Sequence, residues 1–121
     1  MNRLMKTVLV AALLPSTLSI ATPSAPDAAS VTRGKQLYMQ HVCYSCHGTV
    51  GQGGERNAGP KLTPNPFPYE AFVIQMRQPR AIMPRYSAQA LSDQELQSIY
   101  HYVLSIKPSP AANDIPLLRN F

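Results

Sequence analysis

The sequence predicts a small all-α domain made of about three to five short helices. Apolar residues recur at helical spacing in three separate segments, and capping residues or prolines stand at the ends of these segments. No segment has the character of a parallel β-strand, while twelve prolines and six glycines punctuate the chain. About 100 residues are expected in the mature protein, which is one domain with too few residues for a large core.

The first expected helix starts at Ser30, whose hydroxyl is suited to cap it, and runs into the segment 43–47. Its apolar face repeats at i, i+3, i+4 and i+8. This face consists of Gly34, Leu37, Tyr38 and Val42. The following residues 48–60 contain five of the six glycines and no apolar period, so we expect a loop there.

A short middle helix is expected after this loop. It begins at Pro68, because proline is tolerated in the first turn of a helix, and it stops before Pro79. Its apolar residues are Phe72, Val73 and Met76.

The last helix has the clearest pattern. Ser92 and Glu95 have the spacing of a capping box, and Lys107 followed by Pro108 marks the C-terminal end. Between these signals an apolar stripe recurs at helical spacing, and Tyr102 lies just beside it. The stripe consists of Leu96, Ile99, Tyr100, Val103 and Ile106.

These helices place the folded domain at residues 30–107. Residues 1–21 are expected to be a secretory signal, and residues 22–29 a flexible leader. Residues 108–121 are expected to be an extended, proline-containing tail.

The expected signal has the usual layout. Arg3 and Lys6 precede an apolar stretch, and small residues follow up to Ala21, where cleavage is expected, with Ala25 as a second candidate. Pro15 interrupts the stretch, which is shorter than the roughly 20 residues of a spanning helix. An uncleaved membrane anchor is therefore the less favoured alternative, and membrane contact is expected at most through this segment.

Residues 43–47 read Cys-Tyr-Ser-Cys-His, a CxxCH motif. On a helical turn, Cys43, Cys46 and His47 stand at i, i+3 and i+4, so their side chains converge on one side. This pattern is typical of haem c attachment, in which both thiols form thioethers and the histidine binds the iron. A redox dithiol is the alternative, whereas a zinc site lacks a second cysteine pair. Because haem c is normally attached after export in bacteria, motif and signal together predict a periplasmic protein.

Three methionines of the mature chain are candidates for a second axial ligand. Met39 lies on the helix that leads to the motif, and Met76 lies on the apolar face of the middle helix, where a core role is expected. Met83 differs, because Pro84 disfavours helical backbone at the residue before it. We therefore expect Met83 on an extended loop, with its sulfur opposite His47.

The remaining histidines are poorer candidates for this position. His41 is only two residues from Cys43, too near the attachment turn to reach the far face of a haem. His101 lies beside the apolar stripe of the last helix, on the side expected to face solvent.

From about Ser30 to Lys107 the chain resembles the class I mono-haem cytochromes c. The resemblance rests on the CxxCH motif, on three other short segments and on the pattern of the last helix. The three segments are Gly34-Lys35-Gln36-Leu37-Tyr38, Gly59-Pro60-Lys61-Leu62 and Met83-Pro84. It implies short helices wrapped round one covalently attached haem, with the first and last helices crossing closely where Gly34 meets Tyr102.

The resemblance also implies how the haem is held. His47 and Met83 would be the axial ligands of the iron. The carbonyl of Pro60 would accept the Nδ1 hydrogen of His47, and Leu62 would pack against the porphyrin.

With both axial positions filled, the iron would be closed to small molecules and suited to single-electron transfer. The predicted protein is a soluble carrier, or the small cytochrome subunit or acceptor of a periplasmic dehydrogenase, and it is not expected to be an enzyme by itself. Its expected acceptor is a terminal oxidase or another cytochrome. The alternatives are a haem catalyst or gas-binding cytochrome with a labile sixth ligand, and a thiol oxidoreductase without haem.

Charge is informative mainly about partners. The net charge is +5 for the whole chain, and loss of Arg3 and Lys6 leaves nine basic and six acidic residues, or +3. Arg77, Arg80 and Arg85 flank Met83 and predict either a positive rim that steers an acidic redox partner or an ordinary solvated surface. Nucleic acid is not an expected partner, since the basic residues are few.

Overall fold

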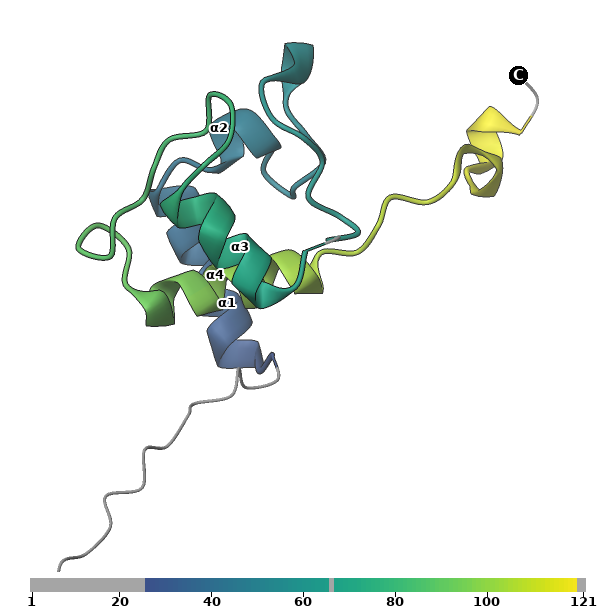
Figure 1. The fold of residues 1–121 in the computed structure, drawn as a ribbon. Helices are drawn as coiled ribbons and strands as arrows, with labels where there is room; N and C mark the ends of the chain where they lie inside the picture. Colours follow the sequence, from purple (N-terminus) through teal and green to yellow (C-terminus); the bar gives the residue numbers. More distant parts are fainter. Residues whose placement is uncertain (1–25, 66, 120–121) are drawn as a thin grey trace, which may run out of the picture.

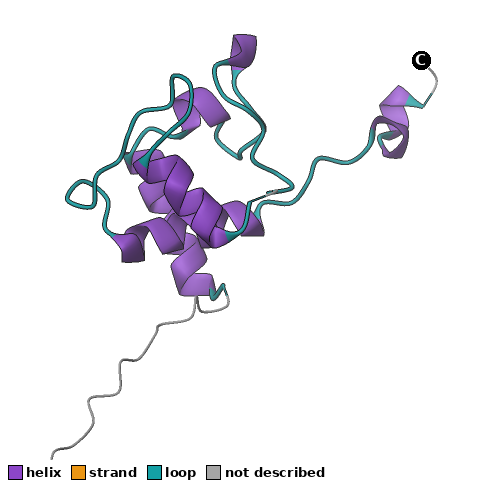
Figure 2. Ribbon diagram, in the orientation of Figure 1, coloured by secondary structure: helices purple, strands orange, loops and turns teal. Residues whose placement is uncertain are grey.

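The computed structural model describes residues 26–65 and 67–119, so the expected signal lies outside the described residues. Helices and loops make up this part of the chain, and no strand occurs in it (Figure 2). The elements are α1 (Ala28–Gln40), α2 (Tyr44–His47), η1 (Glu55–Asn57), α3 (Tyr69–Arg77), α4 (Asp93–Ser105), η2 (Ala112–Asp114) and η3 (Pro116–Leu118). The all-α prediction is confirmed. Over the same ranges, no helix has both the length and the apolar character to cross a membrane.

Helices α1 and α4 cross and form most of the core (Figure 1). Gly34 lies at the crossing, where an added Cβ would overlap the carbonyl oxygen of Ser98 and lie 2.9 Å from Cβ of Tyr102. The rings of Tyr38 and Tyr102 meet edge to face, with centroids 5.3 Å apart. The close crossing implied by the resemblance is therefore present. The buried apolar residues are Leu37, Tyr38, Met76, Leu91, Leu96, Ile99, Tyr102 and Val103.

The cap of helix α1 lies three residues earlier than the sequence predicted. Its N-cap is Asp27, whose carboxylate accepts a 2.8 Å hydrogen bond from the backbone N–H of Ser30. The Ser30 hydroxyl is instead 2.7 Å from Nδ1 of His101 on α4. Ala28 and Ala29 are helical as a result, so the leader expected through Ala29 ends before the cap. A carboxylate also complements the positive N-terminal end of the helix dipole.

The end of α1 also differs from the prediction. The helix stops at Gln40 and does not continue into the motif, because Val42 adopts a left-handed backbone with φ of 60°. This turn brings the N–H of Cys43 to the carbonyl of Tyr38, at 3.1 Å. Val42 consequently leaves the apolar face and is 50% exposed. A β-branched residue in this region is strained by about 1–3 kcal/mol.

Helices α3 and α4 follow the sequence pattern closely. Pro68 is the N-cap of α3, and Met76 is buried in the core as expected. The capping box of Ser92 and Glu95 is present at the start of α4. His101 is the exception, since it is only 2% exposed and does not face solvent. The buried face of α4 is wider than its apolar stripe, because the first turn of α1 covers His101. Ser30, in that turn, supplies a polar partner for the His101 ring.

The tail runs away from the helical body after Pro108 (Figure 1). It is not fully extended, since it contains the short turns η2 and η3. Nε of Arg119 donates to the carbonyl of Asn113 at 3.0 Å and joins these turns. Leu117, at 83% exposure, projects from them.

Candidate functional site

The CxxCH residues lie on a helical turn, as the spacing predicted. Cys43 is the N-cap residue of α2, and its carbonyl accepts hydrogen bonds from the N–H groups of Cys46 and His47, at 3.3 and 3.0 Å. Both thiols are free and half-buried. Two thiols and one imidazole are thereby fixed on a single short turn.

The ring of His47 is oriented by the loop that follows it. Nδ1 lies 2.9 Å from the carbonyl oxygen of Pro60, the contact that the resemblance implied. A carbonyl only accepts, so Nδ1 carries the hydrogen and donates it. In the neutral ring this tautomer places the lone pair on Nε2, as a metal-binding imidazole requires.

The glycine-rich loop has a steric role that the sequence did not reveal. A Cβ on Gly54 would overlap the carbonyl oxygen of Cys46, and a Cβ on Gly59 would lie 2.6 Å from the same atom. The N–H of Gly53 donates to the carbonyl of His47 at 2.8 Å. The loop backbone is therefore packed directly on the motif and carries the chain to Pro60. A cluster of glycines signals a loop from sequence, but it does not identify the surface that the loop touches.

Leu62 closes the same loop. Its N–H donates to the carbonyl of Gly51 at 2.8 Å, and its half-buried side chain packs against the core. Cys43 and Met83 pack against this core as well. Three of the residues predicted to surround the haem, Cys43, Leu62 and Met83, thus pack against one hydrophobic cluster.

Met83 lies in the segment 78–91 between α3 and α4, which we call the Met83 loop. Its backbone is non-helical and its side chain half-buried, as the following proline predicted. Nε2 of Gln75, on α3, donates to its sulfur at 3.4 Å. Sequence reasoning missed Gln75, because a polar residue on the half-exposed side of a helix gives no distinctive signal.

Arg77 does not contribute to a positive rim. Its Nη1 donates to the carbonyls of Tyr86 and Leu91 at 3.0 and 2.8 Å, and its Nη2 pairs with Asp93 at 2.6 Å. The side chain is 17% exposed. Its charge is directed inward onto the Met83 loop, and the expectation of a rim is retained only for the exposed arginines at positions 80 and 85.

The electrostatics of Cys43 do not favour dithiol chemistry. Burial raises the pKa of the Cys43 thiol, so the thiol is protonated at neutral pH. Redox-active CxxC pairs depend instead on a thiolate with a lowered pKa. Burial also raises the pKa of the neighbouring Tyr86 to about 12, and its hydroxyl donates to the carbonyl of His41 at 3.1 Å. Cys43 and Tyr86 therefore both stay neutral at neutral pH.

The donor set fits a c-type haem. Two free thiols three residues apart, an imidazole with Nδ1 engaged and a thioether on a separate loop are the groups that such a haem requires. In the part of the chain that the structure describes, no group of three or more His, Cys, Asp or Glu side chains is arranged to hold a metal ion directly.

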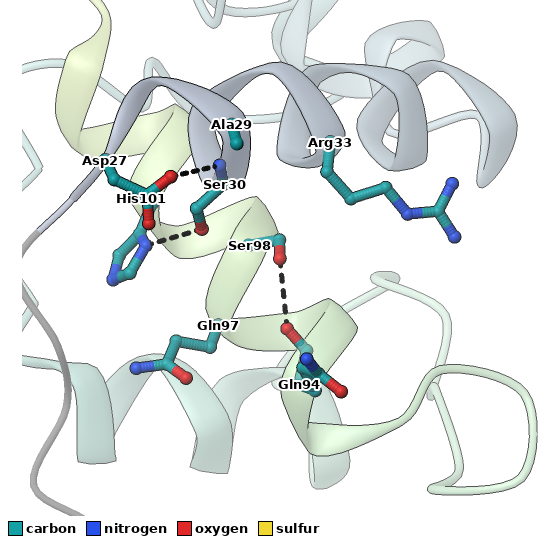
Figure 3. Close-up of a pocket in the computed structure, with 8 residues that line it drawn as sticks. All are labelled: Asp27, Ala29, Ser30, Arg33, Gln94, Gln97, Ser98 and His101. Atoms are coloured by element: carbon teal, nitrogen blue, oxygen red, sulfur yellow. Dashed lines mark hydrogen bonds between the residues drawn. The ribbon is translucent and has the colours of Figure 1, made fainter.

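A polar hollow lies elsewhere, between the first turn of α1 and α4 (Figure 3). The hydrogen bond between Ser30 and His101 crosses one side of it. It contains none of the residues predicted to bind the cofactor. Its lining residues are Asp27, Ala29, Ser30, Arg33, Gln94, Gln97, Ser98 and His101.

Comparison with known proteins identifies the family of the chain. Residues 29–103 match the family described as cytochrome C oxidase, cbb3-type, subunit III. The chain is also similar to a cytochrome bc1 complex cytochrome c subunit of Corynebacterium diphtheriae, with 34% identity over 88 residues. That alignment covers 70% of this chain but only 30% of the relative, so the chain spans about a third of the relative's length. No solved structure matches the chain. Since the family match extends from the first helix to the last and includes the CxxCH turn, the chain belongs to the cytochrome c family.

Proposed function

We propose that the protein is a periplasmic mono-haem cytochrome c that carries single electrons. The observation that supports this most directly is the 2.9 Å contact between Nδ1 of His47 and the carbonyl of Pro60. It leaves Nε2 as a basic, oriented nitrogen beside two free thiols. Structural or disulfide-forming roles for the motif do not require this orientation.

Each residue of the motif has a defined task. Cys43 and Cys46 supply the sulfurs of two thioether bonds, and His47 supplies the proximal nitrogen. The bound haem contributes the chemistry itself, a reversible one-electron change at its iron. Pro60 holds the proton on Nδ1, and Leu62 covers the proximal side with apolar surface.

Met83 is the proposed sixth ligand. Its thioether is a soft donor that favours the ferrous state relative to a second histidine. Met83 is half-buried and packs against the core, so solvent surrounds its side chain only in part. A filled sixth position leaves no room for a small substrate, so electron transfer is the chemistry that the residues support.

The proposed partners are redox proteins of the same compartment. The matched family and the relative are both described as subunits of respiratory complexes. By analogy, this chain would be a small cytochrome subunit or a soluble carrier that passes electrons to a terminal oxidase or another cytochrome. A periplasmic dehydrogenase is the proposed donor, and residues 1–21 are the proposed export signal.

An optical titration of protein produced in the periplasm tests the proposal. A c-type reduced spectrum is expected, together with an oxidised sulfur-to-iron band that is lost in Met83→Ala. Met76→Ala is the matched control and should keep the band, because Met76 is buried in the core. Loss of the band in Met76→Ala alone would contradict the ligand assignment, and carbon monoxide binding to the reduced wild type would favour a labile sixth position.

Covalent attachment is tested separately. Haem should stay with the wild-type protein through acid and solvent extraction, because two thioether bonds retain it. Cys43→Ala and Cys46→Ala should each lower the retained fraction. Complete extraction of the haem from the wild type would contradict the thioether proposal.

A further inference from the structure

We propose that Arg77 is a positioning residue for the sixth ligand, and that its guanidinium holds the Met83 loop closed. The inference rests on the proposed ligation of iron by Met83. It concerns different contacts, however. Arg77 binds the part of the loop from Tyr86 to Leu91, which we call the return arm, and its hydrogen bonds do not involve Met83. Its effect can therefore be measured separately from the ligation.

The Met83 loop requires such a restraint. Around Met83, the side chains of Arg80, Ala81, Ile82, Pro84 and Arg85 are exposed, and Ile82 reaches 85% exposure. Exposed side chains contribute little packing, so a segment of this kind is expected to open locally unless hydrogen bonds hold it. Besides its packing on the core and its contact with Gln75, the Met83 sulfur therefore depends for its position on contacts at the ends of the loop.

Arg77 supplies contacts at the returning end. Nη1 donates to the carbonyl of Tyr86 at 3.0 Å and to the carbonyl of Leu91 at 2.8 Å. Nη2 reaches the carboxylate of Asp93, the first residue of α4, at 2.6 Å. One guanidinium thus joins the end of α3, the return arm of the loop and the start of α4.

Tyr86 links this clamp to the motif. Its N–H donates to the carbonyl of Met76 at 3.1 Å, and its hydroxyl donates to the carbonyl of His41 at 3.1 Å. The residue that accepts from Arg77 is therefore also tied to α3 and to the turn before Cys43. If the clamp opens, Tyr86 and the part of the loop that returns to α4 are released from α3.

The ion pair of Arg77 and its hydrogen bonds to the two carbonyls contribute differently to holding the loop. Asp93 is 79% exposed, so its ion pair with Arg77 is screened by water and contributes little. The bonds from Arg77 to the two carbonyls are part-buried. Lysine keeps the charge but lacks the planar fork that reaches several acceptors at once. The positioning effect should therefore be lost in Arg77→Lys and retained in Asp93→Asn.

The experiment measures loop opening with imidazole, which replaces Met83 on ferric iron when the loop opens. Excess imidazole is mixed with the oxidised, haem-loaded protein, and the loss of the sulfur-to-iron band is followed in time. Arg77→Lys and Arg77→Gln should accelerate this loss at least tenfold, equivalent to about 1.4 kcal/mol. Asp93→Asn and the exposed-site control Arg80→Gln should stay within twofold of wild type. Rates within twofold for both Arg77 variants would overturn the proposal.

Hydrogen exchange tests the proposal if the Arg77 variants do not fold or if Met83 is not the ligand. In wild-type protein, the amide of Tyr86 should be protected, and Arg77→Lys should raise its exchange rate at least tenfold while the amide of Ile99 in α4 is unchanged. An unprotected Tyr86 amide in wild type would overturn the proposal even if no Arg77 variant folds. If Met83→Ala keeps the sulfur band, the ligation proposal fails, yet the exchange result at Tyr86 still decides the clamp.

Discussion

The two proposed axial ligands are held by single hydrogen bonds of different kinds. His47 donates to the backbone carbonyl of Pro60, and Met83 accepts from the side-chain amide of Gln75. The first contact increases electron donation by the imidazole, and the second draws electron density from the sulfur. At the scale of the residue, these contacts would set the donor strength of the two proposed ligands.

Replacement of Gln75 by leucine should therefore lower the reduction potential. The hydrogen bond from the Gln75 amide to the Met83 sulfur disfavours the ferric state. A net contribution of about 0.5–1 kcal/mol from this hydrogen bond corresponds to about 20–40 mV for one electron. The potential is measured by a redox titration of Gln75→Leu against wild type. Gln78→Leu is the control, since its side chain is exposed just after α3. An unchanged or higher potential in Gln75→Leu would show that the amide does not tune the ligand.

Residue identity alone predicted only part of this site. Cys43, Cys46, His47 and Met83 were proposed as site residues because local spacing and a following proline constrain them. Arg77 and His101 were misplaced, because their partners lie elsewhere in the chain. Arg77 reaches Tyr86, Leu91 and Asp93, while His101 meets Ser30 across 71 positions.

Among the helices, the crossing of α1 and α4 determines how the motif is supported. Gly34 allows the backbone of α1 to approach Ser98, and the aromatic pair of Tyr38 and Tyr102 lies beside this contact. The hydroxyl of Tyr38 then donates to the carbonyl of Gly48, just after α2. The crossing therefore fixes the turn that carries the motif.

Gly34→Ala should destabilise the protein by about 1–3 kcal/mol. The added methyl group would meet the backbone of Ser98, which cannot rotate away as a side chain can. The free energy of unfolding is measured by urea denaturation. Lys35→Ala, at the exposed neighbouring position, is the control and should stay within about 0.5 kcal/mol of wild type. Equal stability of Gly34→Ala and wild type would mean that the helices can separate without loss.

The capping box of α4 should make stability depend on acid pH. Hydrogen bonds from the backbone and hydroxyl of Ser92 hold the pKa of the Glu95 carboxyl below its ordinary value of 4.5. A lowered folded-state pKa means that the ionised form stabilises the fold above pH 4.5, and that this contribution is lost as the pH falls through the folded-state pKa.

The stability difference between wild type and Glu95→Gln should accordingly be larger at pH 7 than at pH 3. Urea denaturation at the two pH values measures it. Asp114→Asn removes a carboxyl from the tail and serves as the control. Its stability difference from wild type should not change between the two pH values through the capping box. The opposite trend for Glu95→Gln would contradict the role assigned to the carboxylate.

The elements themselves were largely predictable. The starts of α3 and α4 are encoded by Pro68 and by the Ser92 capping box, which act within a few residues. The end of α1 was not predictable from the sequence, because the left-handed turn at Val42 opposes the backbone preference of a β-branched side chain. Tertiary contacts of the motif and the glycine loop outweigh this local preference.

At the scale of the whole molecule, the tail of the described chain is held mainly by its own hydrogen bonds. The hydrogen bonds of the tail between residues 111 and 119 are formed within the tail. The hydrogen bond nearest to the tail joins two residues of the body. In it, the hydroxyl of Thr63 donates to the carbonyl of Ile106, two residues before Pro108. The tail therefore adds little to the stability of the body.

Deletion of residues 109–121 should leave the body intact. The free energy of unfolding should change by less than about 0.5 kcal/mol, as for surface changes away from the core. The oxidised and reduced spectra should also be unchanged, because the deletion leaves Thr63 and Ile106 in place. Urea denaturation and optical spectroscopy measure these outcomes. A large loss of stability would show that the tail packs on the body in solution.

The sequence by itself determined the family of this protein and most of its helices. A CxxCH turn, a Met-Pro loop and helical apolar stripes act over a few residues, so their spacing carries the information. Only the tertiary structure decided that Arg77 faces the Met83 loop, that His101 is buried and that glycines lie on Cys46. These features depend on burial and hydrogen bonding between distant parts of the chain, and no local pattern encodes which surfaces will meet.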